Sequence, residues 1–185
     1  MPWFFVFFAA LFINGCLNCK DFKRSKIEED IYVLYFQGAK QIDDYLSALE
    51  SKNNSEAFFY HGLLLLDGTL GDVNAGLANY YFLKAIEVAK QAGDVETQKK
   101  AFKAIADSFY SGDGIDLITL RALDYYLASS KLNYLPAMFN VAVVYKEVGC
   151  CQKAIYWMKK YCSFKEAELK DYGNMLLKKW QKEAR

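Results

Sequence analysis

The chain of 185 residues is long enough for one ordinary domain and too short for two of good size. Hydrophobic residues make up 54% of it and prolines number only 2, which excludes a disordered chain and favours helices joined by turns. Lysines and arginines number 23 and acidic residues 22, so a net charge of +1 gives no reason to expect nucleic acid as a ligand.

The N-terminus begins with an apolar segment. No charged side chain lies between Pro2 and Ile13, and the first charged residue is Lys20. A run of this length is typical of the hydrophobic region of an export signal, whereas a membrane-spanning helix needs about 20 residues. We therefore predict a signal peptide over residues 1–15.

The end of this segment resembles the lipobox of bacterial lipoproteins. In Ile13-Asn14-Gly15-Cys16 an aliphatic residue lies three positions before the cysteine and a small residue directly before it, while Asn14 stands where a small or hydroxyl residue is usual. The resemblance implies diacylglycerol on the Cys16 sulfur, cleavage after Gly15 and a lipid anchor in the membrane. Leu17 stands in place of the aspartate that retains many lipoproteins in the inner membrane, which favours the outer membrane.

Residues 16–26 are polar and basic after the cysteine, so we interpret them as a lipidated tether to a domain over residues 27–185. Three alternatives remain open for the N-terminus. They are a plain signal peptide ahead of an ordinary cysteine, an uncleaved anchor, and the buried first helix of a cytosolic protein. Cleavage and acylation distinguish the lipoprotein from all three.

The first part of the domain, residues 27–51, carries apolar residues at helical spacing and is expected to cap the remainder of the domain. The polar stretch Lys52-Asn53-Asn54 interrupts it, and we expect Ser55 to cap the next helix. The apolar residues are Ile31, Leu34, Tyr35, Ile42, Tyr45, Leu46 and Leu49.

The next three segments, at about residues 55–90, 100–133 and 136–162, share one pattern. Each has two small residues five positions apart, a glycine expected to end the first helix, and a second helix with a small residue followed by large ones. Small residues let antiparallel helices approach closely while large side chains fill the space. The small pairs are Ala57/Gly62, Ala101/Ala106 and Ala137/Ala142, the glycines are Gly68, Gly112 and Gly149, and the second helices carry Ala78, Tyr81 and Phe82, then Ala122, Tyr125 and Tyr126, then Ala154, Trp157 and Met158.

This pattern resembles the Sel-one-like repeat, a relative of the tetratricopeptide repeat, over about residues 55–162. The first two segments have the longer loop between helices of the Sel-one-like form, and the third has the shorter tetratricopeptide loop. The resemblance implies an all-α fold, an α-solenoid of stacked antiparallel helix hairpins. The first segment is longer than the second, so we expect either a longer second helix or an inserted loop near Gly93.

The last part of the chain, about residues 164–184, is expected to form a C-terminal capping helix. Leu169, Tyr172, Leu176 and Trp180 form one apolar stripe, and lysines cover the other faces. A terminal helix with a polar outer face keeps a solenoid soluble.

Residues that support catalysis are sparse. His61 is the single histidine, and no motif places a nucleophile or an acid beside it, so we interpret it as a core or surface residue. Gly112-Asp113-Gly114 lacks the strand and the Lys-Ser/Thr of a phosphate loop. No loop has the acidic pattern of a calcium site, and no second cysteine pair completes a zinc site. We therefore expect no enzyme activity, no cofactor or metal and no small-molecule substrate.

Cys150, Cys151 and Cys162 leave two interpretations open. If Cys151 and Cys162 lie on one helix, eleven residues separate them by about 16 Å along its axis. A disulfide requires Cα atoms within ~7 Å. We favour free, mostly buried thiols, and the alternative for an exported protein is one bridge that uses Cys150 in a turn.

The resemblance to helical repeats implies a concave groove, lined mainly by the first helix of each hairpin. We hypothesise a membrane-tethered adaptor or scaffold of the bacterial cell envelope that binds a peptide or helix of another protein in this groove. The alternative is a structural or assembly subunit of an envelope complex with no peptide-binding groove. The side chains expected to face the groove are Phe59, Lys103, Asp107, Tyr110, Phe139 and Lys146.

Overall fold

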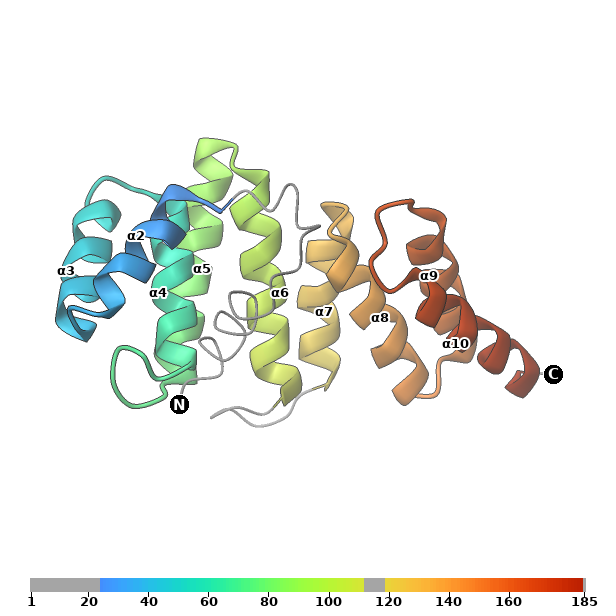
Figure 1. Ribbon diagram of the computed structural model, residues 1–185. Helices are drawn as coiled ribbons and strands as arrows, with labels where there is room; N and C mark the ends of the chain where they lie inside the picture. The colour runs from blue at the N-terminus through green and yellow to red at the C-terminus, as the bar shows by residue number, and fades with distance from the viewer. Residues whose placement is uncertain (1–23, 112–118, 185) are drawn as a thin grey trace. The chain divides into compact units, whose positions relative to one another are not determined.

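Figure 1 shows the computed structural model of the chain, which describes residues 24–111 and 119–184. Within these ranges the chain forms nine α-helices and no β-strand, which confirms the all-α prediction. The predicted signal peptide, the lipidated tether up to residue 23 and Gly112 lie outside the described residues. The helices are α2 Lys26–Tyr35, α3 Ala39–Glu50, α4 Ser55–Leu66, α5 Ala75–Ala92, α6 Val95–Ser111, α7 Thr119–Lys131, α8 Leu135–Glu147, α9 Cys151–Ser163 and α10 Lys170–Glu183.

The helices belong to two compact units, which meet in the sequence between Asp94 and Val95. Unit 1 contains α2 to α5, and unit 2 contains α6 to α10. Within each unit, every helix packs against its neighbour in the sequence. None of the helices in the described ranges combines the length and the apolar content that a bilayer-spanning segment needs.

The N-terminal stretch of unit 1 is divided into two helices at Gly38. Its φ of 113° lies in the left-handed region that favours glycine, and α3 begins at the next residue. The two helices pack against each other, and each also contacts α4. Helical spacing alone predicted apolar positions in residues 27–51 but did not predict this break.

The start of α4 differs from the prediction in its capping residue. The side chain of Asn54, not that of Ser55, accepts a hydrogen bond from the Ala57 amide and caps the helix. Ser55 is the first helical residue, and its hydroxyl donates to Asp94 at 2.7 Å. Both residue types serve as N-caps, so the sequence did not decide between them, and the bond to Asp94 depends on the folded unit.

The α4–α5 hairpin contains a close helix contact at Gly62. A Cβ atom at this position would lie 2.5 Å from Cε1 of Phe82 and 3.0 Å from the carbonyl oxygen of Ala78. Phe82 and Ala78 are both buried on α5. The small residue of the first helix therefore makes room for the large one of the second, as the repeated pattern predicts.

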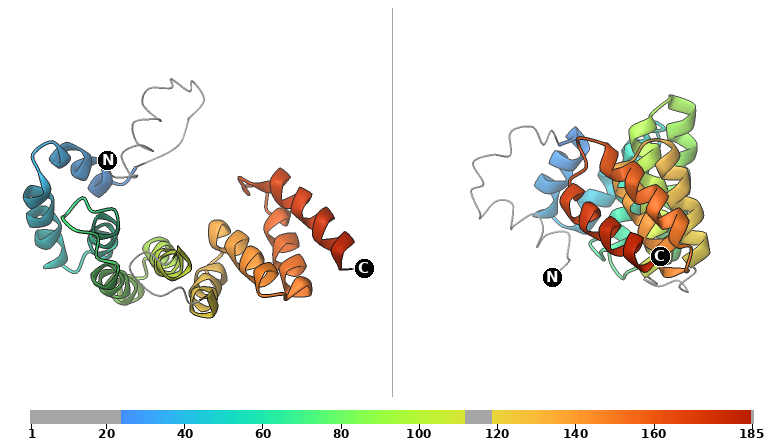
Figure 2. Two further views of the ribbon diagram at one scale, coloured as in Figure 1. Left: turned by 90° about the horizontal axis from the view of Figure 1, so that it is seen from below. Right: turned by 90° about the vertical axis from the view of Figure 1, so that its right-hand side faces the viewer.

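Unit 2 contains two further hairpins, α6–α7 and α8–α9, and Figure 2 shows α6 beside α7. In the first, the Phe109 ring stacks on the Tyr125 ring with centroids 5.8 Å apart. The predicted small residues of both hairpins are fully buried, which agrees with their place at helix contacts. These residues are Ala101, Ala106, Ala122, Ala137, Ala142 and Ala154.

Two of the predicted glycines follow the ends of first helices. Gly68 comes after α4 with a φ of 77°, and Gly149 comes after α8 with a φ of 80°. The loop after α4 is longer than the loop after α8, in the order that the spacing predicted. The extra length of the first segment lies in α5, which has 18 residues and ends at Gly93.

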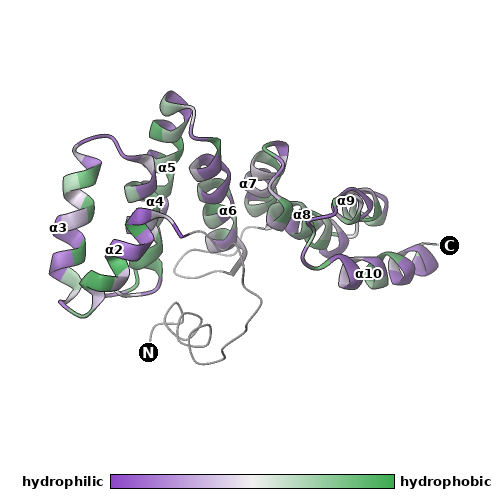
Figure 3. Ribbon diagram, turned by 45° about the horizontal axis from the view of Figure 1, so that its top comes forward, coloured by the Kyte–Doolittle hydropathy of each residue, from purple (hydrophilic) through white to green (hydrophobic). Residues whose placement is uncertain are grey.

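The C-terminal helix α10 buries only part of the predicted stripe: Trp180 is buried and Leu176 packs against the core. Gly173, Leu177 and Trp180 are its buried residues, whereas Leu169 and Tyr172 are about half exposed. A Cβ at Gly173 would lie 2.7 Å from the sulfur of Cys162, so α9 and α10 approach closely at this glycine. Hydropathy alone missed this contact because glycine carries no apolar side chain. Figure 3 shows α10 as a largely hydrophilic helix.

Candidate partner-binding face

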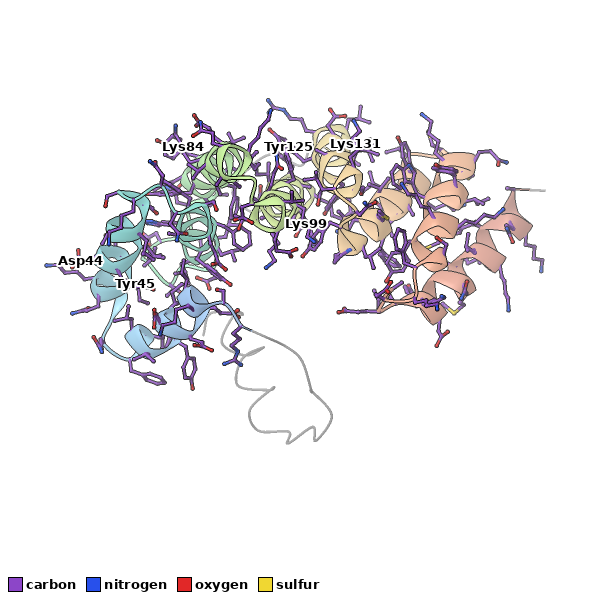
Figure 4. The ribbon with its side chains drawn as sticks, turned by 90° about the horizontal axis from the view of Figure 1, so that it is seen from above. Asp44, Tyr45, Lys84, Lys99, Tyr125 and Lys131 are labelled. Carbon is purple, nitrogen blue, oxygen red and sulfur yellow. The ribbon has the colours of Figure 1, made fainter. Side chains whose placement is uncertain are left out.

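One stripe of polar and aromatic side chains runs along α6. Lys99, Lys103, Asp107 and Tyr110 occur at spacings of three and four residues, which places them on one side of the helix. All four side chains are partly exposed. Figure 4 shows Lys99 on the opposite side of the α6–α7 pair from Lys131. The stripe therefore lies on one side of the α6–α7 pair, and Lys131 lies on the other side.

Asp107 lies at the centre of this stripe and has two partners. The Lys103 ammonium lies 2.5 Å from one carboxylate oxygen, and the Tyr126 hydroxyl donates to the other at 2.7 Å. Tyr126 comes from α7 and is only 1% exposed. Burial, reinforced by the Asp107 charge, raises the pKa of Tyr126 well above its usual range. The hydrogen bond from the buried phenol therefore fixes the position of the Asp107 carboxylate.

Tyr110 connects α6 to α8. Its hydroxyl donates to the two carboxylate oxygens of Glu147 at 2.6 and 2.7 Å. Burial, together with this carboxylate, raises the pKa of Tyr110 to about 12. The Tyr110 ring also contacts the Tyr126 ring edge-on, with centroids 6.2 Å apart. The phenol is thus neutral at physiological pH and serves as a donor.

Phe139 and Lys146 are partly exposed residues of α8 whose side chains contact α9 and α10. The Phe139 ring contacts the rings of Tyr161 and Tyr172, with centroids 5.3 and 6.1 Å away. The Lys146 ammonium lies 2.7 Å from Glu183 of α10 and 3.4 Å from the Cys151 sulfur. The hydrogen bond to Glu183, and then that to Cys151, raises the pKa of Lys146, while burial lowers it.

These side chains lie on two helices of unit 2 that hydrogen bonds connect. We call the set the α6–α8 face. It offers two ammonium groups, two carboxylates, a phenol and a phenyl ring, most of them held by named partners. It consists of Lys103, Asp107, Tyr110, Phe139, Lys146 and Glu147.

Five of the six residues expected to face a groove lie on α6 and α8 of unit 2. Phe59 belongs to unit 1 and is 8% exposed. Its ring packs against those of Tyr60 and Phe82, with centroids 5.5 and 5.9 Å away. Phe59 is a core residue of unit 1 and offers little surface to a partner.

Unit 1 contains a cluster of polar side chains around His61. Its Nδ1 lies 2.7 Å from a carboxylate oxygen of Glu50, and its Nε2 lies 3.3 Å from one of Asp43. The ring stacks on that of Tyr81, with centroids 4.0 Å apart. Burial raises the pKa of Tyr81, and the charges of Glu50 and Asp43 raise it further. The contacts of His61 join α3, α4 and α5, which is the arrangement of a structural core residue.

Sequence reasoning missed the partners of His61 because they come from another helix. Glu50 and Asp43 lie on α3, and no motif relates them to His61. Sequence reasoning likewise missed two partners on other helices. Tyr126 donates to Asp107, and Glu147 accepts from Tyr110. Helical spacing predicts which residues share a face of one helix, but not which residues of a second helix lie opposite.

The three cysteines in the part of the chain that the structure describes are free thiols. Only Cys162 is buried; Cys150 is exposed and Cys151 is partly exposed. The expectation that these thiols are mostly buried was therefore wrong for Cys150. Among the described residues, no group of three histidine, cysteine or acidic side chains has the geometry to hold a metal ion.

Comparison with known protein families and with curated proteins finds no match for this chain.

Proposed function

We propose that the protein is a membrane-tethered adaptor of the bacterial cell envelope and that the α6–α8 face binds a segment of another protein. The observation that carries this proposal is the set of charged and aromatic side chains at the surface of α6 and α8, which the Tyr110–Glu147 hydrogen bonds connect. Such a set matches a peptide that carries both polar and apolar groups. We also infer that the three hairpins are Sel-one-like repeats of an α-solenoid, which the shared spacing of small residues supports.

The hydrogen bonds within the face favour binding because they fix its side chains in advance. Asp107 is held by Lys103 and Tyr126, and Glu147 is held by Tyr110. Ordering a long side chain on binding costs about 0.5–1.5 kcal/mol. A partner that docks against side chains already in place avoids part of that cost.

Charge reversal tests the face. In the Lys103→Glu variant, partner binding should weaken at least about tenfold. The ammonium that pairs with the Asp107 carboxylate is replaced by a carboxylate that repels it. Lys131→Glu makes the same change on the opposite side of the α6–α7 pair and should bind as the wild type does. The measurement is photo-crosslinking in cells, followed by titration of the purified partner.

Two controls make the comparison decisive. Circular dichroism should show that both variants keep the wild-type helix content. Tyr110→Ala should weaken binding in the same direction as Lys103→Glu. Equal binding by Lys103→Glu and Lys131→Glu would show that the partner does not use the α6–α8 face.

The proposed tether rests on the lipobox-like segment that ends at Cys16. If the chain is a lipoprotein, the mature protein loses residues 1–15 and gains acyl mass. Intact mass and membrane fractionation of the protein made in a bacterial host test this, beside a Cys16→Ala variant. Retention of residue 1 without acyl mass would remove the tether from the proposal and leave the α6–α8 face to be tested separately.

One observation favours the second candidate, a structural or assembly subunit. Leu77, Tyr80 and Leu83 occur at spacings of three residues along α5 and are 41%, 54% and 49% exposed. Three exposed apolar side chains on one helix suit packing against another protein. Sedimentation of the wild type and of a Leu77→Ser/Leu83→Ser variant separates the candidates, because only an assembly through α5 changes in mass with the substitution.

A further inference from the structure

The outward side of α9 is basic and aromatic. The helix carries three lysines and no acidic residue, and Met158 on its other side is buried in the core of unit 2. The outward residues follow one another at spacings of three and four, which places them on one side of the helix. We call this set the α9 face. It consists of Lys153, Tyr156, Trp157, Lys159 and Lys160, all of them exposed or partly exposed.

Aromatic rings, not carboxylates, hold two of these lysines. The Lys153 ammonium lies 5.3 Å from the centroid of the Tyr145 ring of α8, and the Lys160 ammonium lies 4.8 Å from the Trp157 ring. Within the described residues, no carboxylate lies at ion-pairing distance from any of the three lysines. A cation–π contact orients an ammonium group without neutralising it. The α9 face therefore keeps its three positive charges.

The lysines of α6 show the opposite arrangement. Lys99 and Lys100 pair with Glu96, and Lys103 pairs with Asp107. Helix α6 thus supplies the carboxylates that neutralise its own lysines, whereas α9 has none. A positive surface without such compensation attracts a partner that carries negative charges.

The aromatic residues of the face narrow the choice of partner. Tyr156 is 61% exposed, and its ring contacts the Trp157 ring edge-on with centroids 5.8 Å apart. Tyrosine and tryptophan concentrate at the headgroup level of a bilayer, where the ring leaves water and its polar atom stays hydrated. Lysines at the same level attract the phosphates of anionic lipids. Lysines beside exposed aromatic rings therefore match the surface of an anionic membrane.

Nucleic acid fits the face less well. The chain has a net charge of only +1, and the three lysines lie within seven residues of helix, a length of about 10 Å. Proteins that bind duplex DNA tightly neutralise about 6–10 phosphates. An acidic peptide would match the lysines as well, so the test below includes one.

We propose that the α9 face docks on the surface of a membrane that contains anionic lipids. The lysines contact lipid phosphates, and the rings of Tyr156 and Trp157 lie among the headgroups. This inference rests on the proposed membrane tether, which keeps the domain close to a bilayer. Stable attachment to a membrane commonly combines a lipid chain with a basic surface, and the α9 face supplies that second contact.

Lysine labelling on vesicles tests the proposal. The full chain is mixed with vesicles of phosphatidylcholine alone or of phosphatidylcholine and phosphatidylglycerol, and is treated briefly with an acetylating reagent. Peptide mass then gives the labelling rate of each lysine. Lys153, Lys159 and Lys160 should react at least about threefold more slowly on the anionic vesicles. Lys103, on the α6–α8 face, is the internal control and should react equally on both.

A matched pair of variants identifies the face. One variant carries Lys→Gln substitutions at the three lysines of α9, and the other carries them at Lys99, Lys100 and Lys103 of α6, so both lose the same charge. Flotation measures how each full chain partitions between anionic and neutral vesicles. Each lysine at an anionic surface strengthens binding about fivefold. The α9 variant should lose at least about tenfold in the ratio of anionic to neutral binding, and the α6 variant should keep the wild-type ratio.

The outcomes separate this proposal from its competitors. Equal labelling of the α9 lysines on both kinds of vesicle, or equal partition of the two variants, would refute it. Protection by a poly-glutamate peptide but not by anionic vesicles would also overturn it and assign the face to an acidic protein. Protection on anionic vesicles of a chain that gains no acyl mass at Cys16 would support the α9 face and contradict only the proposed tether.

Discussion

The phenol of Tyr126 packs in the core of unit 2 while its hydroxyl reaches Asp107 near the surface. The ring fills the place that the repeated pattern assigns to a large side chain of a second helix. The hydroxyl donates to a carboxylate that also binds Lys103. One residue therefore belongs to the core and also supports the α6–α8 face, which explains why tyrosine and not phenylalanine suits this position.

Tyr126 should make the folded protein sensitive to alkaline pH. The unfolded chain releases the tyrosine proton near pH 10, whereas in the folded chain burial and Asp107 raise the pKa of Tyr126. Above about pH 10 the unfolded state then binds fewer protons, so the free energy of unfolding falls as pH rises. Below about pH 10 the contribution of the neutral phenol is fully present.

Denaturant titrations of wild type and Tyr126→Phe at several pH values measure this effect. The variant should lose about 1.5–3 kcal/mol at neutral pH, because a hydrogen bond to a charged group is removed. It should also lose less stability than the wild type between about pH 10 and pH 11. Tyr156→Phe, at an exposed tyrosine, is the matched control and should keep the wild-type pH profile. Parallel profiles for wild type and Tyr126→Phe would contradict the assignment.

At the scale of the helices, the glycines divide into those that contact another helix and those that do not. Gly62 lies against Phe82, so an added methyl group meets a buried ring. Gly76, near the start of α5, is exposed, and an added Cβ would meet only the Asn74 side chain at 3.6 Å. The same substitution therefore has opposite expected effects at the two positions.

Gly62→Ala should destabilise the protein and Gly76→Ala should not. Alanine in a helix is favoured over glycine by up to about 1 kcal/mol. At position 62 the steric cost of overpacking, about 1–3 kcal/mol, exceeds that gain. At position 76 the gain remains, up to about 1 kcal/mol. Thermal unfolding of both variants measures the difference, and a Gly62→Ala protein as stable as the wild type would show that α4 and α5 pack less closely than described.

Local patterns predicted the hairpins well because their determinants lie close together in the sequence. Small residues, turn glycines and large residues at fixed spacing led to α4–α5 and α8–α9, with Gly68 and Gly149 in the expected turns. The break at Gly38 was missed because apolar spacing continues across it. The buried face of α10 was predicted only in part, through Leu176 and Trp180, because the close contact at Gly173 has no side chain to detect.

The candidate face was predictable only in part, for the same physical reason. Lys103, Asp107 and Tyr110 share one side of α6 by helical geometry, and the sequence sufficed to group them. Phe59 was assigned to a surface because its spacing matches a first helix, yet its ring faces inward to Phe82. The partners Tyr126 and Glu147 come from other helices, so three-dimensional packing was needed to find them.

At the scale of the whole molecule, the chain consists of two units, each with hydrogen bonds that join its own helices. Ser55 and Asp94 join the start of α4 to the last residue of unit 1. Tyr110 and Glu147 join α6 to α8 inside unit 2. Each unit also has its own buried residues. Leu64 and Phe82 are buried in unit 1, and Tyr126 is buried in unit 2.

Each unit should therefore fold when it is made alone. Residues 24–94 and residues 95–185 each retain the helix pairs that pack together. Cores of this size supply only about 3–5 kcal/mol, so the fragments should be helical but less stable than larger domains. The sum of their far-ultraviolet circular dichroism spectra should match that of residues 24–185. An unfolded fragment would show that its helices depend on the rest of the chain.

The hydrogen bond between Ser55 and Asp94 also has a genetic consequence. Because Asp94 is the last residue of unit 1, a recombination event whose breakpoint falls between codons 94 and 95 transfers both partners of this bond together. A breakpoint within α5 would separate Ser55 from Asp94 and Gly62 from part of the helix that it contacts. Gene exchange between codons 94 and 95 would therefore transfer unit 1 whole, whereas exchange within α5 would divide it.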